Sequence, residues 1–269
     1  MSERNQPIGI FDSGVGGLTV VRELQKVLPQ EKFIYFGDTA RVPYGNKSPN
    51  TVIKFSLENI VFLLKQNVKL VVVACNTSSS LALPFIRQYF RIPIVGVVNP
   101  AVRESVYATR NMRIGVIGTR ATISSGVYEQ EIKRLAPTIK VFTQSCPLFV
   151  PLVEEGWWEG EVVLNIAQRY LLPLKEKTVD TLILACTHYP LLKKVIKEIM
   201  GEEVALIDSA REVAIEVRKI LEEENLLYQG KRKEKEIIYF VTDKSEAFRE
   251  IGEKFLGGKI KDIYEIKGG

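Results

Sequence analysis

Two cysteines of this chain stand in the same kind of sequence. Residues 71–77 read VVVACNT and residues 182–188 read LILACTH, so an apolar run leads to Cys75 and to Cys186, and polar residues follow each thiol. Short apolar runs of this kind are typical of strands buried on both faces of a sheet. We therefore expect the two thiols at equivalent strand ends. Because a thiol donates a proton and a thiolate removes one, the pair predicts chemistry that needs an acid or a base on each face of a substrate.

The pairing is what favours a catalytic role for Cys75 and Cys186, since a lone cysteine at the end of an apolar strand usually packs in the core. Cys146 has no equivalent in the other half of the chain, and we interpret it as a packing residue. The three cysteines are far apart, odd in number and without a C-x-x-C pair, which predicts neither a metal site nor a disulfide framework. A reducing cytoplasm is the expected location.

A glycine-rich loop at residues 12–17, with the sequence DSGVGG, follows an apolar run and precedes a helical pattern. Such a loop presents backbone N–H groups to an anion at the positive end of the helix dipole. It is not a dinucleotide motif, because G-x-G-x-x-G would need a glycine where the chain has Thr19. The loop could also be only a tight turn in which Asp12 is a cap, although a cap can still be a site residue. We expect a substrate carboxylate here.

Expected strands and helices alternate along the chain, which predicts an α/β fold. The expected strands are residues 8–11, 33–36, 70–74, 94–98, 114–117, 140–143, 181–185 and 205–207. The expected helices between them include residues 18–28, 51–65, 128–135, 161–172 and 191–200. The tail from Arg211 onward holds an amphipathic helix and a strand at residues 237–242, and we expect it to return to the first half of the chain.

The order of the expected elements repeats, with each cysteine after the third strand of its set. This self-similarity predicts two pseudo-symmetric α/β domains with mainly parallel sheets and an active site in the cleft between them. Ligands of parallel sheets bind outside the carboxyl ends of the strands. The polar or nucleophilic side chains expected at such ends are Asp12, Asp38, Cys75, Asn99, Thr119 and Cys186.

The domain boundaries follow from the repeat. We expect residues 1–98 together with 210–269 to form the first domain, which carries Asp12 and Cys75. Residues 99–209 then form the second domain, and its candidate residues are Glu154, Cys186 and His188.

The composition fits ordinary globular domains, with 46% hydrophobic and 26% charged residues among 269. No apolar run approaches the ~18 residues of a membrane span, and the start of the chain lacks the pattern of a secretory signal. The net charge of +5 is modest, and we interpret its densest run, residues 231–235, as a solvated connection. Because no aromatic platform accompanies that run, we expect no nucleic-acid partner.

Several motifs together resemble the glutamate racemase family, within the aspartate/glutamate racemases. They are IGIFDSGVGGLTV, GDTARVPYG, VVACNT, IGVIGT, CPLFVPLVEEG and CTHYP, and the resemblance covers roughly residues 8–210. It implies two domains, a cytoplasmic location, a homodimer and interconversion of L-glutamate and D-glutamate without a cofactor. The D-glutamate of this family supplies peptidoglycan synthesis.

The resemblance also implies roles for individual residues. Cys75 would attack D-glutamate with help from Asp12, and Cys186 would attack L-glutamate beside His188 and Glu154. The residues implied to bind the substrate are Asp12, Ser13, Tyr44, Gly45, Asn76, Thr77, Thr119, Thr187 and His188.

Local readings stay open beside these roles. Asn76, Thr77 and Thr187 could only cap the helices that follow them, residues 43–45 could only form a turn, and His188 could be a turn residue. The aromatic pair of Trp157 and Trp158 is consistent with a domain or dimer contact, and equally with an anchor for a surface helix.

One departure from the family concerns Asn99, since many relatives carry an acidic residue in that segment. We expect Asn99 to cap a helix with Pro100 in its first turn, which leaves an effector role of the acidic group in doubt. Two other functions stay open: a two-thiol racemase for aspartate, and a two-lobed protein that binds an acidic amino acid without converting it.

Overall fold

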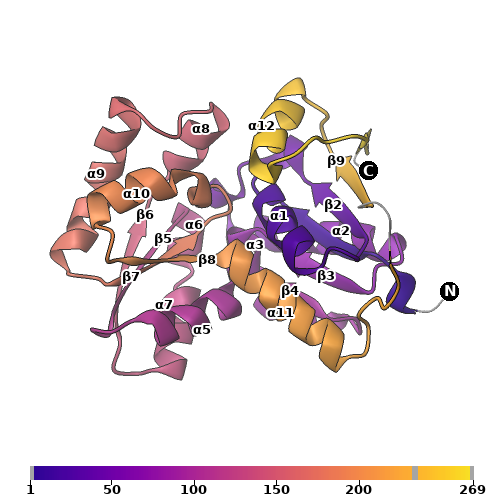
Figure 1. Cartoon of the computed structure of the whole chain (residues 1–269), viewed down its shortest axis with the longest axis horizontal. Coiled ribbons are helices and arrows are strands. Elements are labelled where there is room, and N and C mark those ends of the chain that lie inside the picture. The colour runs from indigo at the N-terminus through magenta and orange to yellow at the C-terminus, as the bar shows by residue number, and fades with distance from the viewer. Residues whose placement is uncertain (1–2, 232–235, 267–269) are drawn as a thin grey trace.

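The repeated apolar runs form two separate parallel sheets. The computed structural model describes residues 3–231 and 236–266, and Figure 1 shows the two sheets side by side with helices around each. The first sheet has six strands in the order β10-β9-β2-β1-β3-β4, and the second has four in the order β6-β5-β7-β8. All adjacent strands are parallel. The predicted α/β fold is confirmed.

The strand order repeats as the sequence predicts, because β2-β1-β3-β4 and β6-β5-β7-β8 have the same order. The strands of the first set are β1 (Ile8–Asp12), β2 (Phe33–Gly37), β3 (Leu70–Val73) and β4 (Ile94–Gly96). Those of the second set are β5 (Arg113–Gly118), β6 (Lys140–Ser145), β7 (Thr181–Ala185) and β8 (Ala205–Asp208). Cys75 and Cys186 therefore follow equivalent strands, β3 and β7.

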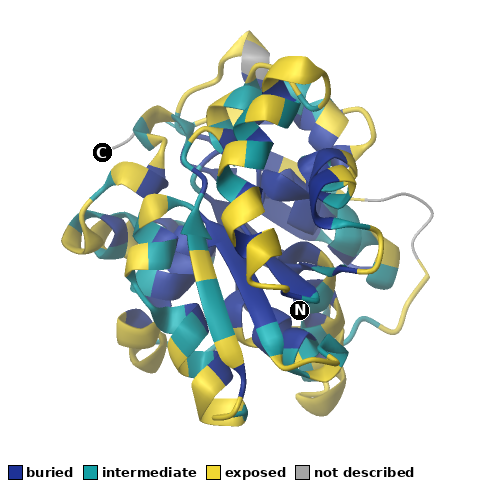
Figure 2. Ribbon diagram, turned by 90° about the vertical axis from the view of Figure 1, so that its left-hand side faces the viewer, coloured by how far each residue is buried: buried dark blue, intermediate teal, exposed yellow. Residues whose placement is uncertain are grey.

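Apolar faces of the helices cover both sheets. In Figure 2 many strands are buried, whereas most helices have one buried and one exposed side. Strand β6, at the edge of the second sheet, has only half-buried and exposed residues. The longer helices are α1 (Leu18–Val27), α2 (Pro49–Lys65), α5 (Val98–Ala108), α7 (Val127–Leu135), α9 (Glu161–Glu176), α10 (Lys193–Met200), α11 (Ser209–Glu223) and α12 (Glu246–Leu256). The short ones are α3 (Asn76–Leu81), α4 (Leu83–Ile86), α6 (Arg120–Ser124) and α8 (Phe149–Glu154). Among the described residues, no helix has the length and apolarity that crossing a bilayer requires.

The C-terminal segment returns to the first sheet. Strand β9 (Ile237–Val241) pairs with β2, and β10 (Ile263–Glu265) pairs with β9. Helices α11 and α12 both pack against α1. The division at residues 98–99 and 209–210 stays a prediction, and residues 232–235 of the basic run lie outside the described residues.

The start of α5 corrects one expectation. The helix begins at Val98, and its N-cap is Val97, which makes no side-chain capping bond. Asn99 is thus inside the first turn and exposed, so its expected capping role is wrong. Pro100 is tolerated there because the N–H groups of the first turn have no intrahelical partner.

Candidate active site

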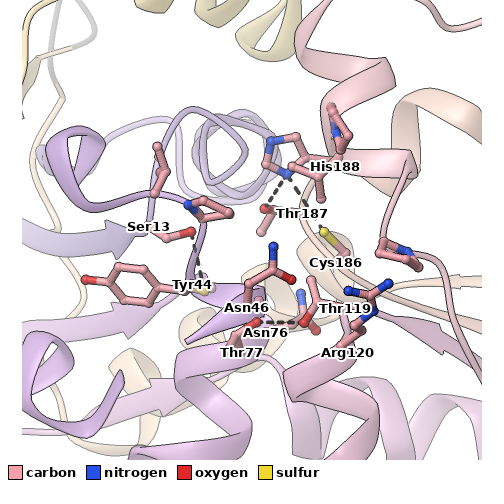
Figure 3. Close-up of a pocket in the computed structure, with 18 of the residues that line it drawn as sticks. Ser13, Tyr44, Asn46, Asn76, Thr77, Thr119, Arg120, Cys186, Thr187 and His188 are labelled. Carbon is pink, nitrogen blue, oxygen red and sulfur yellow. Dashed lines mark hydrogen bonds between the residues drawn. The ribbon is translucent and has the colours of Figure 1, made fainter. Parts of the chain in front are cut away.

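The carboxyl ends of both sheets face a shared cavity of about 610 Å³. Its walls come from the loops after β1, β3, β5, β6 and β7 and from residues 42–46. Cys75 and Cys186 both line it, and each is only 5% exposed. Figure 3 shows Cys186, Thr187 and His188 across this cavity from Ser13 and Tyr44. A molecule bound in the cavity can thus meet one thiol from each half of the protein.

Cys75 occupies a hydroxyl-rich corner of the cavity. It is the N-cap residue of α3, and its Sγ lies 3.7 Å from Ser13 Oγ. Burial and the nearby Asp12 carboxyl raise the pKa of the Cys75 thiol to about 11, although hydrogen bonds from Ser78 and Ser13 oppose this shift. Cys75 is therefore a protonated thiol at neutral pH, ready to act as an acid.

Cys186 faces a histidine backed by a carboxylate. His188 Nδ1 lies 3.8 Å from Cys186 Sγ, and His188 Nε2 lies 2.9 Å from Glu154 Oε1. Burial lowers the pKa of His188, but hydrogen bonds with Cys186 and Glu154 outweigh it and raise the pKa to about 10. His188 therefore brings a positive charge close to the Cys186 sulfur.

Asp12 lies behind the wall of the cavity. Its side chain is fully buried and absent from the lining, and Oδ2 accepts a hydrogen bond of 3.0 Å from the Gly14 N–H. The N-cap of α1 is Gly17, so Asp12 is not the helix cap. Burial raises the pKa of Asp12, and the positive charge of His188 opposes this rise. This position suits a residue that shapes the loop and acts through Cys75 rather than one that contacts the substrate.

Threonine hydroxyls from both halves meet at the floor of the cavity. Thr77 Oγ1 lies 3.0 Å from Thr119 Oγ1 and 3.1 Å from Thr122 Oγ1. Thr119 also caps α6, because its Oγ1 accepts from the Thr122 N–H at 3.2 Å. The Thr119 hydroxyl therefore both caps α6 and lines the cavity.

The neighbouring Asn76 is held by the other half, since its Oδ1 accepts from the Tyr128 hydroxyl at 2.6 Å. Thr187 Oγ1 lies 3.4 Å from His188 Nδ1. Neither residue is the N-cap of the helix or 3₁₀ turn that follows it.

The segment that contains Tyr44 and Gly45 closes another side of the cavity. The Tyr44 hydroxyl donates to Asp38 and accepts from Asn59 Nδ2 at 3.1 Å, so it points away from the cavity. Gly45 packs against the other half of the protein. A Cβ added at Gly45 would lie only 2.7 Å from Thr119 Cβ. The segment is a wall and a contact between halves, not only a turn.

Some residues that line the cavity were not among the predicted site residues. Arg120 follows the predicted Thr119 directly and brings an exposed cation to the cavity. The others are Gly14, Val42, Pro43, Asn46, Pro147, Leu148, Val150, Pro151 and Tyr170. Cys146 is fully buried in the core, consistent with packing. Trp157 is exposed, and Trp158 donates from Nε1 to Val153 O at 3.0 Å.

Comparison with known proteins agrees with this geometry. The profile of the Asp/Glu/hydantoin racemase family matches residues 17–217. A glutamate racemase of Geobacter metallireducens is 54% identical over 263 residues, which cover 96% of each chain. The crystal structure of glutamate racemase from Francisella tularensis in complex with D-glutamate has a TM-score of 0.92 at 39% identity, covering 98% of each chain. The Escherichia coli glutamate racemase, solved with L-glutamate and an activator, has a TM-score of 0.78 at 30% identity, covering 97% of each chain. This chain therefore belongs to the Asp/Glu/hydantoin racemase family, in its glutamate racemase branch.

Proposed function

We propose that this protein interconverts L-glutamate and D-glutamate through Cys75 and Cys186, without a cofactor, and so supplies D-glutamate for peptidoglycan synthesis. The observation that carries the proposal is that two thiols at equivalent strand ends line one cavity. Inversion at Cα requires removal of a proton from one face and delivery of a proton to the other. A single base could only exchange the proton with retention, so two opposed groups are the minimum.

The neighbours of the two thiols support the direction of each step. An imidazolium at His188 favours a Cys186 thiolate, and the raised pKa of Cys75 favours its thiol form. In this protonation state, Cys186 removes the Cα proton of L-glutamate while the Cys75 thiol delivers its proton to the opposite face. When D-glutamate dissociates, Cys186 is a thiol and Cys75 is a thiolate. Proton exchange with solvent restores the first state, and the reverse reaction uses the second.

The Cα proton is weakly acidic, so the cavity must stabilise the negative charge that develops on the substrate carboxylate. The donors available to stabilise this charge are side-chain hydroxyls and the backbone N–H groups of the same loops. The hydroxyls belong to Ser13, Thr77, Thr119 and Thr187. Donors that are already held in place stabilise such charge more effectively than water does. Here the threonine contacts and the Thr119 cap hold them.

The location and the assembly of the protein belong to the same proposal. The three cysteines are buried free thiols, which supports a reducing cytoplasm as the location. We also propose a homodimer, which sedimentation can distinguish from a monomer of 30.4 kDa.

Incubation with L-glutamate in D2O tests the function. We expect optical rotation to disappear while deuterium enters Cα. Unchanged glutamate beside measurable binding would instead indicate a binding protein, and faster turnover of aspartate would indicate an aspartate racemase.

Alanine variants test the roles of the two cysteines. Cys75→Ala and Cys186→Ala should each abolish racemisation, whereas Cys146→Ala, the matched control, should retain it. Full turnover in either of the first two variants would refute the assigned roles.

A further inference from the structure

The C-terminal helix α12 contacts the histidine beside Cys186. The ring of Phe255 meets the His188 imidazole at a centroid distance of 5.3 Å and an interplanar angle of 81°, an edge-to-face geometry. Phe255 is fully buried. It comes from the segment that returns to the first half, beyond residue 217 where the family match ends, whereas His188 follows β7 of the second half.

Packing adds to the polar contacts that orient the His188 ring, of which only the contact with Glu154, at 2.9 Å, is short. The contact from Nδ1 to Cys186 is long at 3.8 Å, and the torsion that turns an imidazole has broad minima. A small rotation would move Nδ1 away from the thiol and Nε2 away from Glu154 together. Phe255 and Gly16 also confine the ring, since a Cβ added at Gly16 would lie 2.6 Å from His188 Cε1.

The same end of α12 also reaches the segment after Glu154. Lys254 Nζ lies 5.4 Å from the centre of the Trp158 ring, and Trp158 in turn donates to Val153 O, next to Glu154. One end of α12 therefore contacts both His188 and the segment that carries its carboxylate partner.

We propose that Phe255 is a positioning residue for the reaction, which holds the His188 imidazole so that Nδ1 faces Cys186 while Nε2 faces Glu154. The inference rests on the proposed function, because it deepens the account of how Cys186 becomes a base. It makes α12 part of the catalytic apparatus although none of the described side chains of α12 lines the cavity.

A direct test exploits the fact that His188 is the only histidine of the chain. In protein labelled with 15N-histidine, the imidazole signals report the tautomer and protonation of this residue alone. The titratable groups that face it are Glu154 from α8, Cys186 from the loop after β7 and Asp12 from the end of β1. Phe255→Leu keeps an apolar side chain but removes the ring, and Phe255→Met serves if the leucine variant does not fold.

We expect both Phe255 variants to shift the 15N signals towards those of a free imidazole and to lower the pKa of His188. The turnover number should fall roughly two- to tenfold with KM unchanged, the range expected from loss of one aromatic contact. Phe248→Leu is the matched control, since Phe248 is buried in the same helix and lies against Gly37. Its 15N signals should match those of the native protein.

Unchanged 15N signals in a folded Phe255 variant would overturn the proposal, as would equal changes in Phe248→Leu. The spectra do not require turnover. If the native protein failed to racemise glutamate, the proposed function would fail while the spectra still decided whether Phe255 orients His188.

Discussion

Glu154 Oε1 lies 2.9 Å from Nε2 of His188, whose Nδ1 faces the Cys186 thiol. Cys75, at the equivalent position of the other half, faces the Ser13 hydroxyl and is influenced by the buried Asp12 carboxyl instead. The repeated fold thus gives two thiols with different electrostatic surroundings. The His188 imidazole lies beside the Cys186 sulfur, whereas a buried carboxyl influences Cys75.

Removal of the Glu154 charge should make activity more sensitive to alkali. The carboxylate helps to raise the pKa of His188 to about 10, so Glu154→Gln lowers that pKa and the imidazolium is lost at a lower pH. We expect the alkaline decline of kcat/KM to move down by about one pH unit, as for removal of an opposite charge in contact. Profiles of kcat/KM between pH 7 and 11 measure this shift.

The two enantiomers provide an internal control for these profiles. Because they have equal free energies in water, kcat/KM must be the same in both directions at every pH. Profiles for L-glutamate and D-glutamate should therefore superimpose in the native enzyme and in Glu154→Gln. An alkaline decline that stays in place in the variant would show that His188 does not control it.

Isotope effects can assign each thiol to one enantiomer, which kcat/KM cannot. In Cys75→Ser every proton transfer through residue 75 becomes slow, with turnover reduced by about 10²- to 10⁴-fold. Cα-deuterated D-glutamate should then show a larger isotope effect than in the native enzyme, and Cα-deuterated L-glutamate a smaller one. Cys186→Ser should show the reverse pattern. If both serine variants gave the same pattern, or exchanged patterns, the assignment of Cys75 to D-glutamate would be wrong.

The fold was accessible from the sequence where local pattern determines structure. Continuous apolar runs predict β3 and β7 because strands buried on both faces need no polar alternation, and the cysteines after them follow directly. Other elements lack such a signal. Strand β10 has only three residues and α6 only five, too few to establish a period.

The site was less accessible, because its important contacts join distant parts of the chain. Glu154 and His188 are 34 positions apart and meet only through the packing of α8 beside the loop after β7. The contact of Phe255 with His188 crosses between the two halves and leaves no mark in either local sequence. Asp12 is a site residue by pattern, yet the tight turn at Gly14 buries its side chain behind the cavity.

The close contact at Gly16 should be essential for activity. A Cβ added at Gly16 would lie 2.3 Å from Thr187 Oγ1 and 2.6 Å from His188 Cε1, so Gly16→Ala must displace these side chains. Misplacement of catalytic groups by about 1 Å costs on the order of 10²-fold in rate. We expect that loss in kcat/KM for Gly16→Ala. Gly258→Ala, with no atom within 4 Å of the added Cβ, should keep native activity. Native turnover in Gly16→Ala would mean that Thr187 and His188 can shift without loss of activity.

The Tyr44 hydroxyl should matter for stability and little for substrate binding. It donates to buried Asp38 and accepts from Asn59, away from the cavity that the rest of the residue lines. Tyr44→Phe leaves these buried polar groups short of a partner, which should lower the free energy of unfolding by about 1–3 kcal/mol. KM for glutamate should change by less than about twofold, since the hydroxyl points away from the cavity and the contacts that bind the substrate are retained. Urea unfolding and initial rates measure the two quantities.

Tyr239→Phe is the matched control, because the buried Tyr239 hydroxyl has no hydrogen-bond partner within the described residues and its removal should cost little stability. A large rise in KM with unchanged stability in Tyr44→Phe would instead place the hydroxyl on the substrate.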